Sequence, residues 1–134
     1  MKVVLDTNVF VSGVFFSGPP FQILQAWRDG KIQLIISLEI LDEYRRVGEI
    51  LADEHSAIDL EPMLEYVTHN AVVFLVPSLL ERVCDDPDDD KFLACALTSG
   101  SNLVVSGDKH LLKVSGYQNI EVLKPRDFLD KYLG

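Results

Sequence analysis

The stretch Val3-Val4-Leu5-Asp6-Thr7-Asn8 is a short apolar run that ends in three turn-forming polar residues. Apolar runs of this length, bounded by turn formers, are typical of strands that are buried on both faces of a parallel sheet. The stretch therefore predicts a strand with its carboxyl end at Asp6. Parallel sheets bind ligands beyond the carboxyl ends of their strands, which makes Asp6 a candidate site residue. The alternative for Asp6 is a simple hydrogen-bonded turn, which is common after strands.

Similar apolar runs recur along the chain and alternate with segments of helical spacing. Further strands are expected at residues 32–36, 71–76, 103–105 and 120–123. Helices are expected from Phe21 to Gly30, from Leu38 along an apolar stripe to Leu51, from about Glu61, from about Asp90 to Ser99, around Leu111 and from Pro125 to Tyr132. A loop is expected at Gly13, Gly18, Pro19 and Pro20. Because parallel neighbours need crossover connections, the alternation predicts an α/β fold with helices on both faces of a parallel sheet.

Composition indicates a globular protein of one domain. The 134 residues include 48% hydrophobic and 25% charged side chains, and no linker or internal repeat divides them. We therefore expect a single domain that spans residues 1–134. No apolar run approaches the roughly 20 residues of a membrane span, and the chain begins without the apolar segment of a secretion signal. Cys84 and Cys95 lack the spacing of a zinc site or a redox dithiol, so we expect both to be reduced in a cytoplasmic protein.

The formal net charge of -9 argues at first sight against a nucleic-acid partner, which usually meets lysine and arginine side chains. Much of the acidic excess lies in one run at 85–90, where bound cations would offset the charge. Several basic residues lie near the acidic positions in sequence and could form the rim of a phosphate-binding groove, or only a solvated face: Arg45, Arg46, Lys91, Lys109 and Lys113.

Four acidic residues occupy positions where carboxylates are unusual: Asp6 and Asp108 after apolar strands, Glu43 beside an apolar helix stripe, and Asp90 at the start of a helix. Carboxylates gathered from distant parts of a chain stay charged side by side only if a cation neutralises them. Mg²⁺ and Mn²⁺ prefer such oxygen ligands. The four residues therefore predict a pocket for a divalent metal. Asp108 has the alternative of capping a short helix, and Ser106 in the same loop could orient a ligand or satisfy a turn.

Glu43 carries more weight than an ordinary helical glutamate. It lies three residues after Ile40 and four before Val47, so its carboxylate projects beside the packed side of the helix. A buried glutamate needs a partner, and Arg45 and Arg46 lie elsewhere on the helical wheel. The alternative is that Glu43 lies at the edge of the stripe and reaches water.

The run Asp85-Asp86-Pro87-Asp88-Asp89-Asp90-Lys91 allows more than one interpretation. Acidic residues are favoured at a helix start, which accounts for two or three of them. A calcium-binding EF-hand loop is excluded because the motif lacks its glycine and its closing glutamate. The surplus of acid favours a third interpretation, in which Asp90 directs its carboxylate inward while Asp88 or Asp89 lies nearby.

Taken in order, four segments resemble the PIN domain family across nearly the whole chain. They are Val4-Leu5-Asp6-Thr7-Asn8-Val9-Phe10, the helix of Glu43, Asp86-Pro87-Asp88-Asp89-Asp90-Lys91-Phe92-Leu93-Ala94, and Val105-Ser106-Gly107-Asp108-Lys109. The chain is most similar to small prokaryotic PIN proteins of VapC-type toxin-antitoxin pairs. The resemblance implies a three-layer α/β sandwich with a parallel five-stranded sheet flanked by helices.

The same resemblance implies a ribonuclease that depends on Mg²⁺ or Mn²⁺. Carried over by position, Asp6, Glu43, Asp90 and Asp108 fall on the acidic site of the family, while Asn8 and Ser106 match its accompanying polar positions. This chain has His110 where many relatives carry a further acid, and Asp88 could assist in holding the metal.

We therefore expect a metal-dependent endoribonuclease that hydrolyses phosphodiester bonds of RNA, as the toxin of a toxin-antitoxin pair. The resemblance adds an antitoxin protein as a partner, and a homodimer as a further possibility. The competing hypothesis is a catalytically silent PIN-fold module that binds a protein or RNA, which the low basicity and His110 favour.

Overall fold

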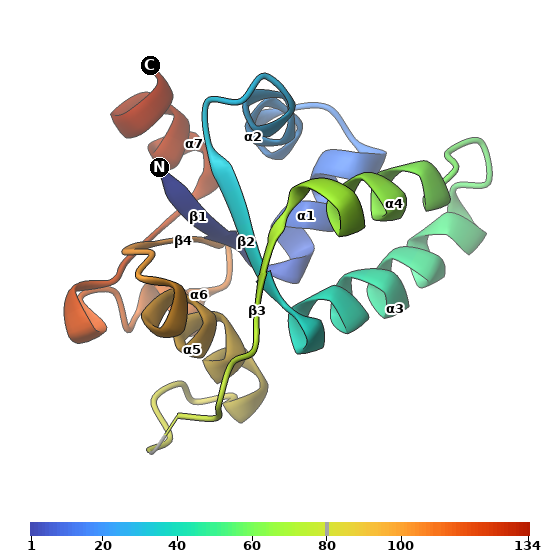
Figure 1. Cartoon of the computed structure of the whole chain (residues 1–134). Helices are drawn as coiled ribbons and strands as arrows, with labels where there is room; N and C mark the ends of the chain where they lie inside the picture. The colour runs from blue at the N-terminus through green and yellow to red at the C-terminus, as the bar shows by residue number, and fades with distance from the viewer. Residues whose placement is uncertain (80) are drawn as a thin grey trace.

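Five short strands form one parallel sheet at the centre of the protein (Figure 1). The computed structural model describes residues 1–79 and 81–134. The strands are β1 (Lys2–Leu5), β2 (Gln33–Ser37), β3 (Val72–Phe74), β4 (Leu103–Val105) and β5 (Glu121–Leu123). Their order across the sheet is β3-β2-β1-β4-β5, and each neighbouring pair is parallel. The predicted α/β architecture, a parallel five-stranded sheet flanked by helices, is confirmed.

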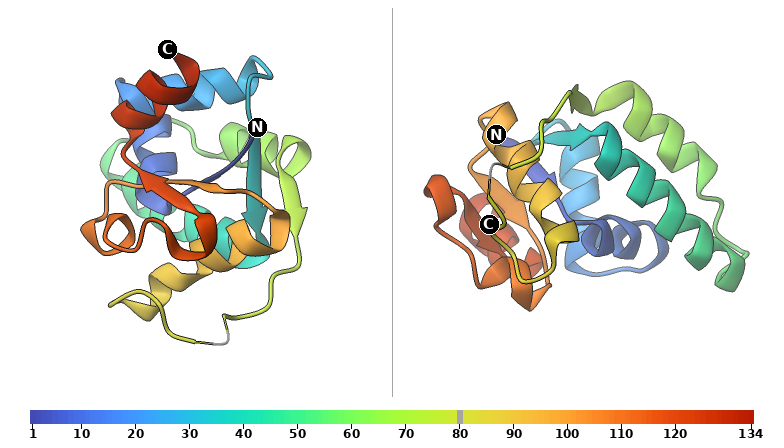
Figure 2. Two further views of the ribbon diagram at one scale, coloured as in Figure 1. Left: turned by 90° about the vertical axis from the view of Figure 1, so that its left-hand side faces the viewer. Right: turned by 90° about the horizontal axis from the view of Figure 1, so that it is seen from below.

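Helices cover both faces of this sheet. They are α1 (Thr7–Phe15), α2 (Pro19–Arg28), α3 (Leu38–Glu54), α4 (Glu61–Asn70), α5 (Asp90–Ser99), α6 (Lys109–Leu112) and α7 (Pro125–Phe128). Short helical turns add η1 (Pro87–Asp89), η2 (Tyr117–Asn119) and η3 (Leu129–Leu133). Helix α5 packs across β1, β2 and β4 on one face, and α1, α2 and α7 lie on the opposite face (Figure 2).

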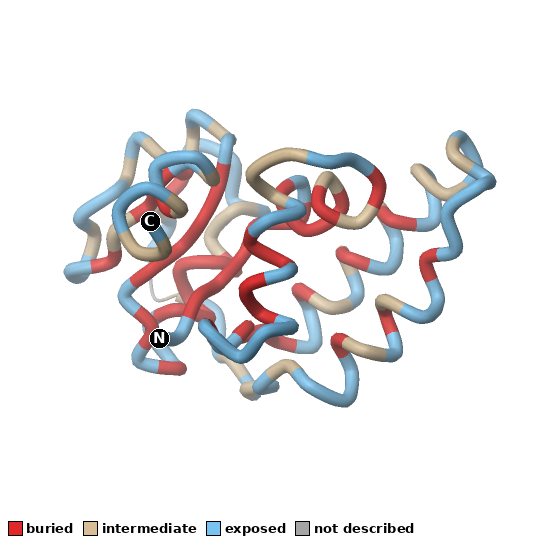
Figure 3. Tube along the Cα trace, turned by 90° about the horizontal axis from the view of Figure 1, so that it is seen from above, coloured by how far each residue is buried: buried red, intermediate tan, exposed pale blue. Residues whose placement is uncertain are grey.

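The core follows the sheet and the inward sides of the helices (Figure 3). Strand residues such as Val4, Ile35 and Val104 are fully buried, as expected for a sheet that is covered on both faces. Among the described residues, no helix is both long and apolar enough to cross a membrane.

Helix α1 lies in a segment where the sequence predicts a turn followed by a loop, and that prediction is wrong. The side chain of Asp6 caps the helix by accepting a hydrogen bond from the backbone N–H of Val9 at 3.1 Å. Gly13 lies inside the helix rather than in a loop, where a Cβ atom would approach Leu24 Cδ1 to 2.7 Å. Buried apolar residues, including Phe10, override the weak helix propensity of the segment.

Helix α3 is fixed to the end of β1 by Tyr44. The Tyr44 ring stacks on Phe10 of α1 with 4.1 Å between the ring centroids, and its buried hydroxyl donates to the carbonyl of Leu5 at 2.6 Å. Because Glu43 precedes Tyr44, these contacts hold the Glu43 side of α3 next to the carboxyl end of β1.

The strand order reverses direction at β1. From there the chain passes to β2 and β3 on one side, and β4 and β5 lie on the other. Crevices at such a switch point, beyond the carboxyl ends of the strands, are the usual ligand sites of open α/β sheets. Asp6 directly follows β1, and Ser106 and Asp108 follow the neighbouring strand β4.

Candidate metal centre

A small acidic cleft of about 60 Å³ opens at the switch point. Its lining comes from the ends of β1 and β4, from α3 and from the segment that leads into α5, and comprises Asp6, Thr7, Asn8, Glu43, Val47, Asp89, Phe92 and Asp108. Four carboxylates from four parts of the chain therefore meet in one place.

Asp6 is the most deeply buried of these acids, at 4% exposure. One carboxylate oxygen accepts the α1 capping bond, and the other accepts a hydrogen bond from the hydroxyl of Ser106. Burial raises the pKa of Asp6, and the bonds from Ser106 and Val9 only partly offset that rise. Asp6 is thus held in a fixed orientation. A nearby positive charge would stabilise its buried carboxylate.

Asp108 is connected to Asp6 through the same serine. The Ser106 Oγ atom, which donates to Asp6, accepts a hydrogen bond from the backbone N–H of Asp108 at 2.9 Å. The Asp108 side chain in turn accepts from the backbone N–H of His110 at 2.7 Å and lies 3.3 Å from His110 Nδ1. The predicted capping role of Asp108 and its place in the cleft are therefore compatible.

Asp89 completes the acidic side of the cleft. Its Oδ2 atom is buried and, among the residues that the structure describes, has no hydrogen-bond partner. Burial raises the pKa of Asp89 to about 6, with further contributions from the charges of Asp108, Asp86 and Asp6. Ligand atoms of Asp89, Asp108 and His110 all lie within 4.8 Å of one another. A buried anionic oxygen without a donor is satisfied well by a cation, so this group of residues fits a divalent metal.

Glu43 borders the cleft, but both of its oxygens are already engaged. Thr7 Oγ1 donates to one oxygen, and Lys91 Nζ donates to the other. Arg46 Nη2 lies 3.6 Å from that second oxygen. The expectation that Glu43 lacks a basic partner is thus wrong.

Residues 2–110 match a family model described as the PIN domain. The chain belongs to the PIN domain family. PIN domains are usually nucleases and generally bind divalent metals, in agreement with the acidic cluster at the switch point. This PIN protein is also similar to the uncharacterized protein MJ1680 of Methanocaldococcus jannaschii. The two are 28% identical over 148 aligned positions, which cover 98% of this chain and 92% of that protein.

The sequence suggested that Asp90 directs its carboxylate into the cleft of this PIN domain. In the structure it does not. Its two oxygens accept backbone N–H groups of Cys84 at 2.7 Å and of Val83 at 3.2 Å. The short turn η1 precedes α5, and neighbouring residues of a helix point about 100° apart, so Asp89 rather than Asp90 faces the cleft. Asp90 anchors the loop before α5 instead.

Asp88 also lies away from the cleft. Its side chain is 65% exposed, and its carboxylate lies 3.0 Å from Lys91 Nζ. The hydrogen bond from Lys91 lowers the pKa of Asp88. Asp88 therefore shares the lysine that neutralises Glu43. Asn8 lines the cleft, as the family position implies.

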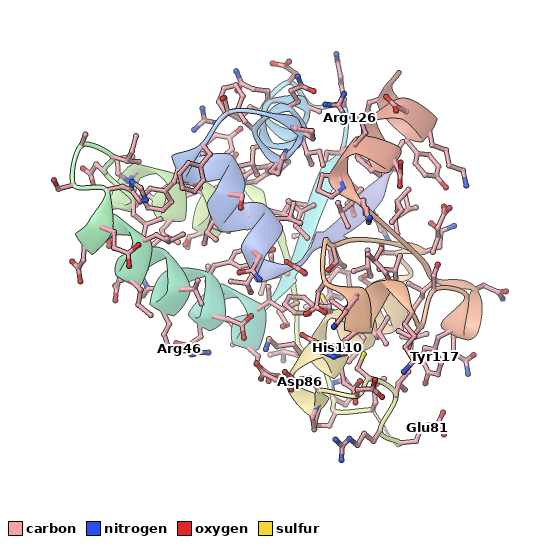
Figure 4. The ribbon with its side chains drawn as sticks, turned by 180° about the vertical axis from the view of Figure 1, so that it is seen from behind. Arg46, Glu81, Asp86, His110, Tyr117 and Arg126 are labelled. Atoms are coloured by element: carbon pink, nitrogen blue, oxygen red, sulfur yellow. The ribbon has the colours of Figure 1, made fainter. Side chains whose placement is uncertain are left out.

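The expected basic rim is present only in part (Figure 4). Arg46 and His110 lie at the end of the molecule where the strands end, together with Asp86, whereas Arg126 lies at the opposite end. Arg45 pairs with Glu61 at 3.2 Å, and Lys113 pairs with Asp85 at 2.9 Å. Arg46 contacts Glu43 at the border of the cleft and remains largely exposed, at 63% of its side chain.

Proposed function

We propose that this PIN protein is an endoribonuclease that hydrolyses RNA phosphodiester bonds with the help of Mg²⁺ or Mn²⁺. The observation that supports the proposal most strongly is the unpartnered, buried oxygen of Asp89 beside Asp6 and Asp108. A structural cluster of acids would be expected to satisfy that oxygen with a donor of its own. Here the residues that the structure describes leave it without a donor, at the place where ligands of such sheets bind.

Asp89 and Asp108 would hold the ion directly, with Asp6 as a ligand directly or through water and His110 beside Asp108. When bound, the metal would activate a water molecule and neutralise charge that develops on the phosphate. Ser106 would orient both flanking acids, because its hydroxyl contacts Asp6 and the backbone of Asp108 together.

The exposed guanidinium of Arg46 would meet the RNA at the border of the cleft. Its position next to Glu43 supports this role, because an exposed positive charge there would attract an approaching phosphate. Thr7 and Glu43 would keep the wall of the cleft in place through their mutual hydrogen bond. Asn8, which lines the cleft, would contribute an uncharged polar side chain for the substrate.

In the cell, the proposed role is that of the toxin in a VapC-type toxin-antitoxin pair in the cytoplasm, as the motifs of the chain imply. The antitoxin would insert a segment into the acidic cleft. A basic segment suits that role, because the net charge is -9 and the cleft is lined by carboxylates. A homodimer is part of the same proposal.

Incubation of the purified protein with a mixed RNA pool, in Mg²⁺ or Mn²⁺ and in EDTA, tests the activity. We expect cleavage with metal, none in EDTA, and none from Asp108→Asn. Asp42→Asn is the matched control, because Asp42 is an exposed acid of α3 that does not line the cleft. Cleavage in EDTA, or full activity of Asp108→Asn, would contradict the proposal.

A structural observation also favours the silent-module hypothesis: the protein itself engages both Glu43 oxygens. It is the conclusion to draw if the protein binds RNA or a partner while every metal condition leaves the RNA pool intact.

A further inference from the structure

Lys91 is a buried charge in the first turn of α5. The residue is 8% exposed, and its ammonium group donates to Glu43 Oε2 and to the carbonyl of Asp88 at 2.9 Å. The Asp88 carboxylate is 3.0 Å from the same nitrogen. Two carboxylates, from Glu43 and Asp88, thus flank this ammonium group. Lys91 is therefore held as a cation.

The lysine approaches Glu43 from the side away from the cleft. Lys91 and Asp88 both line a neighbouring cavity of about 330 Å³, whereas Glu43 lines the acidic cleft itself. Burial of an unpaired charge is costly, so Lys91 and Glu43 each make the burial of the other's charge tolerable. The carboxylates of the cleft thus fall into two groups. Glu43 is neutralised by Lys91, whereas Asp89 Oδ2 has no partner among the described residues.

We propose that Lys91 is a built-in cation that neutralises Glu43 at one wall of the cleft and limits this protein to a single divalent ion, held by Asp89 and Asp108 with Asp6. The inference rests on the proposed metal centre, and it adds the number of ions and the residue that sets it. Lys91 acts as a positioning residue, since it reaches the site only through Glu43.

Geometry supports this division of the cleft. A Mg²⁺ ion lies about 2.0–2.1 Å from its ligand oxygens and requires near-octahedral surroundings. An ion bound to Glu43 Oε2 would lie beside the Lys91 ammonium group, which already donates to that atom. Arg46 Nη2 is also 3.6 Å from the same oxygen. The other oxygen accepts the hydroxyl of Thr7. By contrast, the Asp89 Oδ2 atom has no competing donor among the described residues.

Counting bound Mn²⁺ ions tests the inference without any activity measurement. Free Mn²⁺ is followed by electron paramagnetic resonance during titration of the full chain at pH 7.5. We expect one ion for the wild type and two for Lys91→Met, which keeps the aliphatic stem and removes the charge. Lys113→Met is the matched control, because Lys113 pairs with an exposed aspartate outside the cleft, and it should bind one ion.

A double variant, Glu43→Gln with Lys91→Met, keeps the test decisive if the single variant does not fold. Removal of both charges together avoids a buried unpaired carboxylate, so the double variant should fold and bind one ion. Two ions in the wild type, one ion in a folded Lys91→Met, or two ions in the double variant would each overturn the inference. No bound ion in any protein would instead refute the metal centre, and with it the proposed function.

Discussion

Replacement of Asp89 by asparagine should stabilise the metal-free protein at neutral pH. The folded state raises the pKa of Asp89 from 3.8 to about 6, so between these pH values the folded chain keeps a proton that the unfolded chain has lost. The contribution of Asp89 to stability is therefore greatest below pH 4 and is lost as pH rises through 6. At 1.36 kcal/mol per pKa unit the shift corresponds to about 3 kcal/mol, and because Asp89 is only partly buried, solvent screening reduces this to about 1–2 kcal/mol.

The measurement is thermal unfolding in EDTA, followed by circular dichroism at pH 4 and at pH 7.5. We expect Asp89→Asn to raise the midpoint by roughly 3–6 °C at pH 7.5 and to leave it nearly unchanged at pH 4. Asp88→Asn is the control of opposite sign, because the hydrogen bond from Lys91 lowers the pKa of Asp88. Removal of the Asp88 charge should therefore not stabilise the protein at pH 7.5. An Asp89→Asn variant that is no more stable than the wild type at pH 7.5 would refute the reasoning.

Three further predictions follow from the site and its support. At pH values above 6, saturating Mn²⁺ should raise the thermal unfolding midpoint of the wild type. At pH 4.5, where Asp89 is protonated, the rise should be much smaller, and an equal rise at both pH values would contradict this. Ser106→Ala should weaken Mn²⁺ binding about 10-fold or more, measured by calorimetry, because Asp6 loses the donor that orients it; unchanged affinity would remove Ser106 from the site. Gly13→Ala should destabilise the fold by about 1–3 kcal/mol in urea titration, because the new methyl group would meet Leu24, whereas a neutral result would show that α1 and α2 can separate.

The order of strands and helices could be predicted from the sequence because each strand is a compact apolar run between turn formers. The missed helix α1 shows the limit of this approach. Its segment contains Asn8 and Gly13, which are poor helix formers, and several β-branched residues. What makes it helical is the packing of residues such as Phe10, which stacks on Tyr44 of α3, a contact between segments far apart in sequence.

The site was predictable at the strand ends and less so elsewhere. Asp6 and Asp108 follow strands, so their position is fixed by the topology of a parallel sheet. The choice between Asp89 and Asp90 depends on the rotation of one short turn before α5, which a run of consecutive aspartates cannot reveal. A signal for Lys91 did exist, because this lysine lies in the first turn of α5, directly before the apolar residues Phe92 and Leu93.

The most direct test of the metal centre is a crystal soaked in Mn²⁺ and measured for anomalous scattering. We predict one strong peak per chain between the side chains of Asp89 and Asp108, within reach of Asp6, and no peak at the oxygens of Glu43. A well-diffracting crystal with no peak in the cleft, or with peaks only along the exposed acids of 85–88, would contradict a divalent metal centre at the switch point.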